Sequence, residues 1–137
     1  MNLPILRSRS ELSIWRDQQK GLINFVPTMG GLHKGHAKLI QSAKEYMGKE
    51  PSIVLVSIFV NPLQFGANED FKNYPRELSK DCKIAFDSGA NAVWAPSYKD
   101  VFPAKDISRL KIKIPEGLQK HLCGMNRKGH FDGVAKA

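Results

Sequence analysis

The chain has 137 residues, of which 42% are apolar and 25% charged, and these values are typical of one globular domain with its own core. No apolar run approaches the ~18–20 residues that cross a bilayer, and the N-terminus shows no secretory signal, so we expect a cytoplasmic protein that does not contact membranes. The net charge of +8 favours anionic partners, but the basic residues form no long block and do not alternate with aromatic residues, which favours a solvated surface over nucleic-acid binding.

Helices and strands alternate in the first half of the sequence. A helix is predicted from a cap at Ser10 to about Lys20, and residues 22–27 are predicted to form a strand. A second helix is predicted over residues 35–47, with apolar side chains on one face: Leu39, Ile40, Ala43 and Met47. Residues 53–60 are almost entirely apolar and mostly β-branched, as in a strand that is buried on both faces of a parallel sheet.

The second half continues the alternation after a polar loop at residues 61–76, which is typical of a functional loop. A helix is predicted over residues 77–88, ending at Gly89, with inward side chains at Leu78, Cys82, Ala85 and Phe86. Residues 91–95 fit a third strand. The remaining predicted elements are a helical turn at 97–102, a strand at 107–114, a short helix at 115–122, a basic loop at 123–130 and a last helix from about 131.

This order of elements predicts an α/β fold in which a parallel sheet is flanked by helices. In such sheets, ligands bind at the carboxyl ends of the strands. Residues 28–36 and 61–66 each follow a predicted strand, so we expect both segments to lie at that edge of the sheet.

Residues 28–36 carry the most informative motif, which reads Thr-Met-Gly-Gly-Leu-His-Lys-Gly-His. A helix start presents unpaired backbone N–H groups and the positive end of the helix dipole, and glycine lets a ligand approach the backbone closely. His33 and His36 are three residues apart, so they share a helix face and can reach one phosphate chain. The motif therefore indicates a phosphate site.

Two other interpretations of these histidines stay open from the residues alone. They are ordinary polar side chains at a helix start, or they chelate a metal ion, although no third ligand follows at an obvious spacing. A second metal cluster can be drawn from His121, Cys123 and His130, but its spacing matches no standard site. We therefore predict no metal centre.

Two amide side chains, Asn61 and Gln64, follow the 53–60 strand. An amide offers both an acceptor and donors, which suits a small hydroxy acid. The alternative is turn chemistry, with Asn61 before a proline and Gln64 as polar surface. Arg127 and His130 are further candidates for binding the same small molecule. The alternative is that they are only part of a charged loop and a helix cap.

Four segments, at 25–36, 56–66, 73–76 and 129–134, together resemble the pantothenate synthetase family in sequence, order and spacing. The His-x-Gly-His element within the first is shared with a wider superfamily of nucleotidylyltransferases (the HIGH type). The resemblance implies a Rossmann-like fold of that superfamily. The second segment, which contains Asn-Pro-Leu-Gln-Phe, is much more specific to the family.

The resemblance implies an AMP-forming ligase that joins (R)-pantoate to β-alanine in two steps. Pantoate attacks Mg²⁺-ATP to give pantoyl adenylate and pyrophosphate, and the amine of β-alanine then displaces AMP. By the same resemblance, His33 and His36 are the catalytic residues, with His36 as proton donor. Asn61 and Gln64 bind pantoate, and Gln64 also contacts β-alanine or the adenylate. The residues that bind ATP are Met29, Gly30, Gly31, Leu32, His33, Lys34, Gly35 and His36.

The resemblance also implies that these 137 residues are an incomplete N-terminal nucleotide-binding domain, without the family's later phosphate-binding segments and smaller C-terminal domain. We therefore expect little or no activity from this segment alone, and a homodimer is expected for the family. Two alternatives are a small stand-alone nucleotidylyltransferase and a truncated, non-catalytic dimerising module. The 61–66 segment argues against the first of these.

Overall fold

The structure, a computed structural model of the chain, describes residues 2–46, 52–103 and 134. It contains two compact units, the first made of Met1–Phe59 and Pro75–Asp100 and the second of Val60–Tyr74 and Val101–Ala137. The strand expected at 107–114 and the helix expected at 115–122 lie outside the described residues, as does Met47. Of the last helix, expected from about residue 131, Val134 alone is described, and it is helical.

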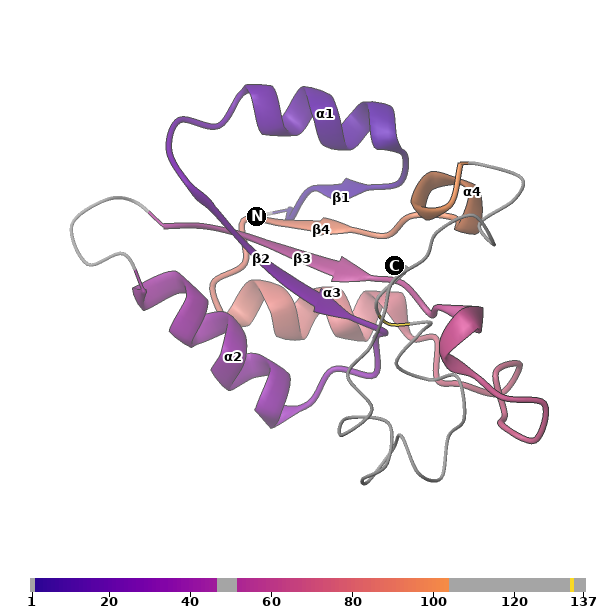
Figure 1. The fold of residues 1–137 in the computed structure, drawn as a ribbon. Coiled ribbons are helices and arrows are strands. Elements are labelled where there is room, and N and C mark those ends of the chain that lie inside the picture. The colour runs from indigo at the N-terminus through magenta and orange to yellow at the C-terminus, as the bar shows by residue number, and fades with distance from the viewer. Residues whose placement is uncertain (1, 47–51, 104–133, 135–137) are drawn as a thin grey trace, which may run out of the picture. The chain divides into compact units, whose positions relative to one another are not determined.

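Four parallel strands form the centre of the first unit (Figure 1). They lie in the order β1 (Ile5–Leu6), β4 (Ala92–Trp94), β3 (Ile53–Ile58) and β2 (Ile23–Thr28). The register places Val56 of β3 opposite Val26 of β2 and Val93 of β4. The predicted parallel α/β fold is thus confirmed. β1 was missed because two residues are too few to show a strand's periodicity.

β3 is the central strand and the most deeply buried one. Its first five residues are buried and only Ile58 is partly accessible, so the apolar run does mark a strand that is covered on both faces. Phe59 and Val60, which the sequence assigned to this strand, lie beyond its end. The central position of β3 fixes where the loops after β2 and β3 begin.

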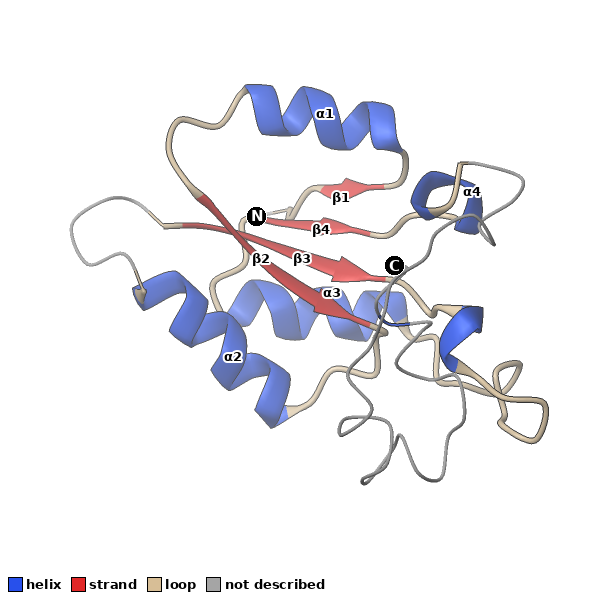
Figure 2. Cartoon of the chain, in the orientation of Figure 1, coloured by secondary structure: helices blue, strands red, loops and turns tan. Residues whose placement is uncertain are grey.

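Helices cover both faces of the sheet (Figure 2). α1 (Arg9–Asp17) lies on one face, while α2 (Lys34–Glu45) and α3 (Leu78–Asp87) lie on the other. Alternate side chains of β3 pack on opposite faces of the sheet. Leu55 joins a cluster with Trp15 of α1, whereas Val54 and Val56 join a larger cluster that includes residues of α2 and α3. The larger cluster also contains Leu32, from the loop between β2 and α2.

The start of α1 corrects the sequence prediction. Ser8 is the N-cap, not Ser10, and its side chain accepts a hydrogen bond from the backbone N–H of Glu11 at 3.1 Å. Glu11 in turn accepts from the backbone N–H of Arg7 at 2.6 Å. A serine followed three residues later by glutamate is a capping-box pattern, and of the two candidate caps Ser8 has it and Ser10 does not. The helix also ends at Asp17 rather than near Lys20.

Two side chains predicted to face inward are exposed. Leu39 of α2 is 53% exposed and Phe86 of α3 is 41% exposed. Each is the immediate neighbour of a fully buried residue, Ile40 or Ala85, and so points about 100° away from it on the helix. The apolar stripe of both helices is therefore narrower than the sequence suggests.

Of the remaining short elements, α4 (Tyr98–Val101) and the end of α3 match the sequence prediction, whereas a 3₁₀ turn within the polar loop was not predicted. α4 is the expected single turn, and the 3₁₀ turn, η1 (Pro62–Gln64), opens the polar loop after β3. Gly89 follows the end of α3 with φ +102°, as expected for a helix stop. In the described ranges, no helix is long and apolar enough to cross a membrane.

Candidate functional site

The loop between β2 and α2 is anchored to the sheet by Thr28. Its hydroxyl donates to the backbone oxygen of Ser57 in β3 at 2.8 Å and accepts from the backbone N–H of Gly30 at 3.1 Å. One hydroxyl therefore links the last residue of β2, the neighbouring strand and the first turn of the loop. The site begins at the carboxyl edge of the sheet, as predicted.

A buried carboxylate fixes the next part of the loop. Asp81 of α3 is 2% exposed, and its two oxygens accept from the backbone N–H groups of Gly31 at 3.0 Å and Leu32 at 2.7 Å. Sequence reasoning missed this residue. The signal was present, because Asp81 falls among Leu78, Cys82 and Ala85 on the inward face of the helix, where a charged side chain needs a partner.

Gly30 is the point of closest approach between the loop and Asp81. Its φ is +82°, which side chains other than glycine rarely adopt. A Cβ atom there would lie 2.9 Å from Oδ2 of Asp81 and 3.1 Å from Cγ2 of Ile58. Glycine at this position therefore serves both the backbone turn and the packing against α3.

His33 ends the loop and begins α2. It is the N-cap residue, with extended backbone at φ −140°, and its Nδ1 accepts from the backbone N–H of Gly35 at 3.0 Å. Nδ1 of His36 accepts from the backbone N–H of His33 at 3.3 Å. The two histidines thus cap the helix reciprocally, in the way that serine and glutamate do elsewhere.

These bonds define what the two imidazoles present to a ligand. Because each Nδ1 accepts from a backbone N–H, the proton of the neutral ring lies on Nε2 in both His33 and His36. The ring centroids are 4.2 Å apart with a 50° tilt. The expectation that the histidines meet is confirmed, and together they offer two adjacent N–H donors.

The backbone N–H groups of the loop correct another expectation. The amides of five residues already have acceptors within the chain: Gly30, Gly31, Leu32, His33 and Gly35. The sequence suggested unpaired amides as the phosphate ligands, but these five are occupied by side chains that cap and brace the loop. Of the groups described so far, the imidazole N–H donors are the better suited to a phosphate.

The protonation of His36 is set by its surroundings. Partial burial and the neighbouring His33 lower the pKa of the His36 imidazole below its ordinary value, and Asp81 opposes them. His36 is therefore neutral near pH 7, with its proton on Nε2. Of the other predicted nucleotide ligands, Met29 lies in the loop and is partly buried, and Lys34 is exposed as the first residue of α2.

The two amide residues lie in the second unit. Asn61 is 1% exposed, and its Oδ1 caps η1 by accepting from the backbone N–H of Leu63 at 3.1 Å. The backbone N–H of Gln64 donates to the backbone oxygen of Asn61, also at 3.1 Å. Asn61 therefore performs turn chemistry, one of the two predicted roles. The expectation that this segment meets the histidine loop stays a prediction.

The same loop is held by aromatic contacts of its own. Phe65 packs edge to face against Phe71, with ring centroids 5.3 Å apart, and against Tyr74, at 5.6 Å. The backbone N–H of Gly66 donates to the carboxylate of Glu69 at 3.2 Å. This polar segment is thus an organised loop, as predicted, and not a linker.

The remaining predicted candidates lie in the last part of the sequence. Arg127 and His130 fall outside the described residues, as do His121 and Cys123. Within residues 2–46 and 52–103, no group of three His, Cys, Asp or Glu side chains is arranged to hold a metal ion.

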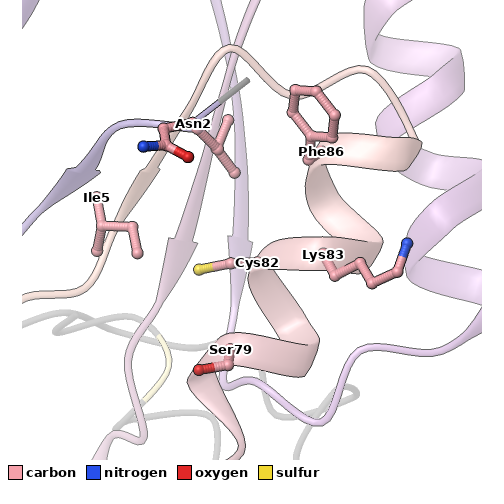
Figure 3. Close-up of a pocket in the computed structure, with 7 residues that line it drawn as sticks. Asn2, Ile5, Ser79, Cys82, Lys83 and Phe86 are labelled. Atoms are coloured by element: carbon pink, nitrogen blue, oxygen red, sulfur yellow. The ribbon is translucent and has the colours of Figure 1, made fainter.

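A separate hollow of about 560 Å³ lies between the start of the chain and α3 (Figure 3). It is lined by Asn2, Leu3, Ile5, Ser79, Cys82, Lys83 and Phe86. Burial and the neighbouring Asp81 raise the pKa of the Cys82 thiol, so the thiol stays protonated at neutral pH and is a poor nucleophile. Neither histidine lines this hollow.

Comparison with known proteins identifies close relatives. The family described as pantoate-beta-alanine ligase matches residues 4–137. A bifunctional pantoate ligase/cytidylate kinase of Prochlorococcus marinus is 56% identical over 137 residues, which cover 98% of this chain and 26% of the relative. The chain thus spans about a quarter of that relative's length.

The similar solved structures are pantothenate synthetases, also called pantoate-beta-alanine ligases. Pantothenate synthetase from Thermus thermophilus has a TM-score of 0.79 and 36% identity, covering 98% of this chain and 46% of that one. Pantoate-beta-alanine ligase from Francisella tularensis, complexed with beta-gamma ATP and beta-alanine, has a TM-score of 0.83 and 36% identity, covering 98% and 50%. The chain therefore spans about half of each solved protein.

Proposed function

Because the chain belongs to the pantoate-beta-alanine ligase family, we propose that the whole protein joins (R)-pantoate to β-alanine at the expense of ATP. The whole protein here means the polypeptide that its gene encodes around these 137 residues. In the first step, a carboxylate oxygen of pantoate bonds to the α-phosphorus of ATP and pyrophosphate leaves. In the second, the amine of β-alanine bonds to the acyl carbon of pantoyl adenylate and AMP leaves.

The observation that carries this proposal is the pair of imidazoles at the start of α2. They hold two Nε2–H donors side by side on a braced backbone, which suits the charge that grows on phosphate oxygens as pyrophosphate departs. Phosphoryl chemistry asks the protein mainly for positioning and charge stabilisation. ATP and β-alanine are the ligands of the similar Francisella protein.

The proposed roles are divided between the loop at residues 29–36 and the two amide residues. Residues 29–36 bind ATP, with His33 and His36 on the phosphates. His36, the proton donor that the resemblance implies, acts in its neutral form by donating its Nε2–H as a hydrogen bond to the departing group. Asn61 and Gln64 hold pantoate, and Gln64 also contacts β-alanine or the adenylate. A neutral amide orients a carboxylate without adding a competing nucleophile. Arg127 and His130 stay predictions of the sequence for the same pocket.

Mg²⁺ fits this site as a companion of ATP and not as a resident ion. Asp81 already accepts two backbone N–H groups, and the described residues offer no cluster of metal ligands. Mg²⁺ usually keeps several waters and binds through substrate phosphates, where it neutralises their charge. The Rossmann-like character of the domain and a homodimer also belong to the proposal and rest on the family resemblance. A cytoplasmic location is proposed with them.

The 137-residue chain alone should form pantothenate at least about 100-fold more slowly than the whole protein, because it spans only about half of each similar solved ligase and a partial site stabilises less charge. The measurement is pantothenate formed from pantoate, β-alanine and ATP by both proteins at equal concentration. Comparable turnover by the short chain would contradict this expectation. Absence of activity from the whole protein as well would contradict the proposed function itself.

Replacing Gly35 by alanine should separate positioning from stability. A Cβ atom there would lie 2.8 Å from Cε1 and 3.0 Å from Nδ1 of His33, so the ring must move. Alanine is also a better helix former than glycine by about 1 kcal/mol. We expect an unchanged or higher melting temperature, together with a loss of about 10- to 100-fold in adenylate formation.

Gln41→Ala is the matched control, because Gln41 is exposed on the same helix, five residues beyond His36. It should change neither quantity. A Gly35→Ala variant that keeps the parental rate would show that the position of the His33 ring does not matter.

A further inference from the structure

Asp81 is the only acidic side chain that is buried among the residues that the structure describes. Burial of a carboxylate carries a large desolvation cost unless hydrogen bonds compensate for it. On an ordinary helix face this position would be apolar, as Leu78, Cys82 and Ala85 are. The charge at Asp81 therefore needs a reason beyond the packing of α3.

The contacts of Asp81 point to that reason. Both of its oxygens accept backbone N–H groups of the loop about fifty positions earlier, at 3.0 Å from Gly31 and 2.7 Å from Leu32. Gly30, lacking a side chain, lets the carboxylate come this close. The loop is thus clamped from α3 at one point and from β3, through Thr28, at another.

We propose that Asp81 is a positioning residue for ATP, whose carboxylate holds the backbone of residues 30–32 so that His33 and His36 present their Nε2 atoms to the phosphates. This proposal rests on the proposed function. In this role Asp81 does not contact the nucleotide directly, because it is 2% exposed and its two oxygens face the backbone of the loop. It acts through the imidazoles of His33 and His36, which lie one and four residues after Leu32 in the sequence.

A carboxylate is suited to this task and an amide is not. Both oxygens of the carboxylate are acceptors, matching two N–H donors. An asparagine in the same place has one acceptor, so its NH₂ group faces one of the backbone donors. Asp81 also acts on His36 electrostatically, because its negative charge opposes the lowering of the His36 pKa by burial and by His33.

The test compares Asp81→Asn with Asp87→Asn in the whole protein. Asp87 lies on the same helix, but it is exposed and pairs only with Lys83, at 2.7 Å, so its substitution controls for the chemical change. The assay is pantoate-dependent exchange of pyrophosphate into ATP, with KM measured for both substrates. The second readout is the pKa of His36, followed by NMR titration of its ring.

We expect Asp81→Asn to lower kcat/KM for ATP roughly 10- to 100-fold, as for the loss of a hydrogen bond to a charged group, with KM for pantoate unchanged within about twofold. The pKa of His36 should fall, because the carboxylate that raises it is gone. Asp87→Asn should leave all three values at the parental level.

Equal values for Asp81→Asn and Asp87→Asn in an active protein would overturn the positioning role and leave the proposed function intact. A parent protein without pantoate-dependent exchange would instead overturn the proposed function. If Asp81→Asn does not fold, amide hydrogen exchange of the parent protein tests whether Asp81 holds the loop. The amides of Gly31 and Leu32 should then be protected, and rapid exchange at both would contradict the clamp.

Discussion

The His36→Ala variant is expected to form adenylate about 100- to 1,000-fold more slowly than the parent, which is the usual cost of removing one donor that stabilises transition-state charge. The reason is geometric. Nδ1 of His36 accepts a hydrogen bond from the backbone N–H of His33. This bond fixes the ring and leaves its Nε2–H as the donor for a ligand. The lowered pKa keeps this ring neutral and its proton in place near pH 7.

Two further substitutions separate the functions of the two ring nitrogens. Asparagine at position 36 retains an acceptor near the place of Nδ1 but no donor near Nε2, and glutamine places an amide N–H closer to Nε2. We expect His36→Gln to recover part of the rate and His36→Asn to recover none. Lys38→Ala, on the exposed side of α2, is the control. A parental rate for His36→Asn would assign the role of His36 to helix capping alone.

Of the single alanine substitutions in the loop, Gly30→Ala should lower the free energy of unfolding most. The positive φ costs about 1–3 kcal/mol for a residue with a side chain, and overpacking against Asp81 and Ile58 adds about as much again. We therefore expect a loss of about 2–5 kcal/mol in the free energy of unfolding, measured by urea denaturation of the 137-residue chain.

Gly21→Ala is the comparison for this effect. Gly21 also has a positive φ, but a Cβ atom there meets nothing within 4 Å. This variant therefore carries the conformational cost without the contact and should be the milder of the two. Equal losses for both substitutions would mean that the approach of Asp81 to Gly30 does not constrain the loop.

The sequence predicted those features that depend on local periodicity and on glycine-rich turns. The buried run at β3 and the meeting of His33 with His36 follow from patterns within about ten residues, and the parallel arrangement follows from the order in which strands and helices alternate. Such patterns record burial and secondary structure directly. The family resemblance added the chemistry, because the motif alone indicates only a phosphate at a helix start.

The features that the sequence did not predict depend on contacts between distant segments. Asp81 lies about fifty residues from the loop that it holds, and only the fold reveals that its carboxylate occupies the amides of Gly31 and Leu32. The cap of α1 is a different case. The serine and glutamate three residues apart were visible in the sequence, but Ser10 is also a good capping residue, and propensity alone does not choose between two serines.

If the whole protein activates pantoate with ATP, it must also catalyse isotope exchange between pyrophosphate and ATP. Labelled pyrophosphate is incubated with the whole protein, ATP and Mg²⁺, with or without (R)-pantoate, and in the absence of β-alanine. We predict label in ATP only when pantoate is present, because the first step is reversible and needs no amine. Exchange that is independent of pantoate, or no exchange when ATP, Mg²⁺ and pantoate are all present, would contradict this prediction.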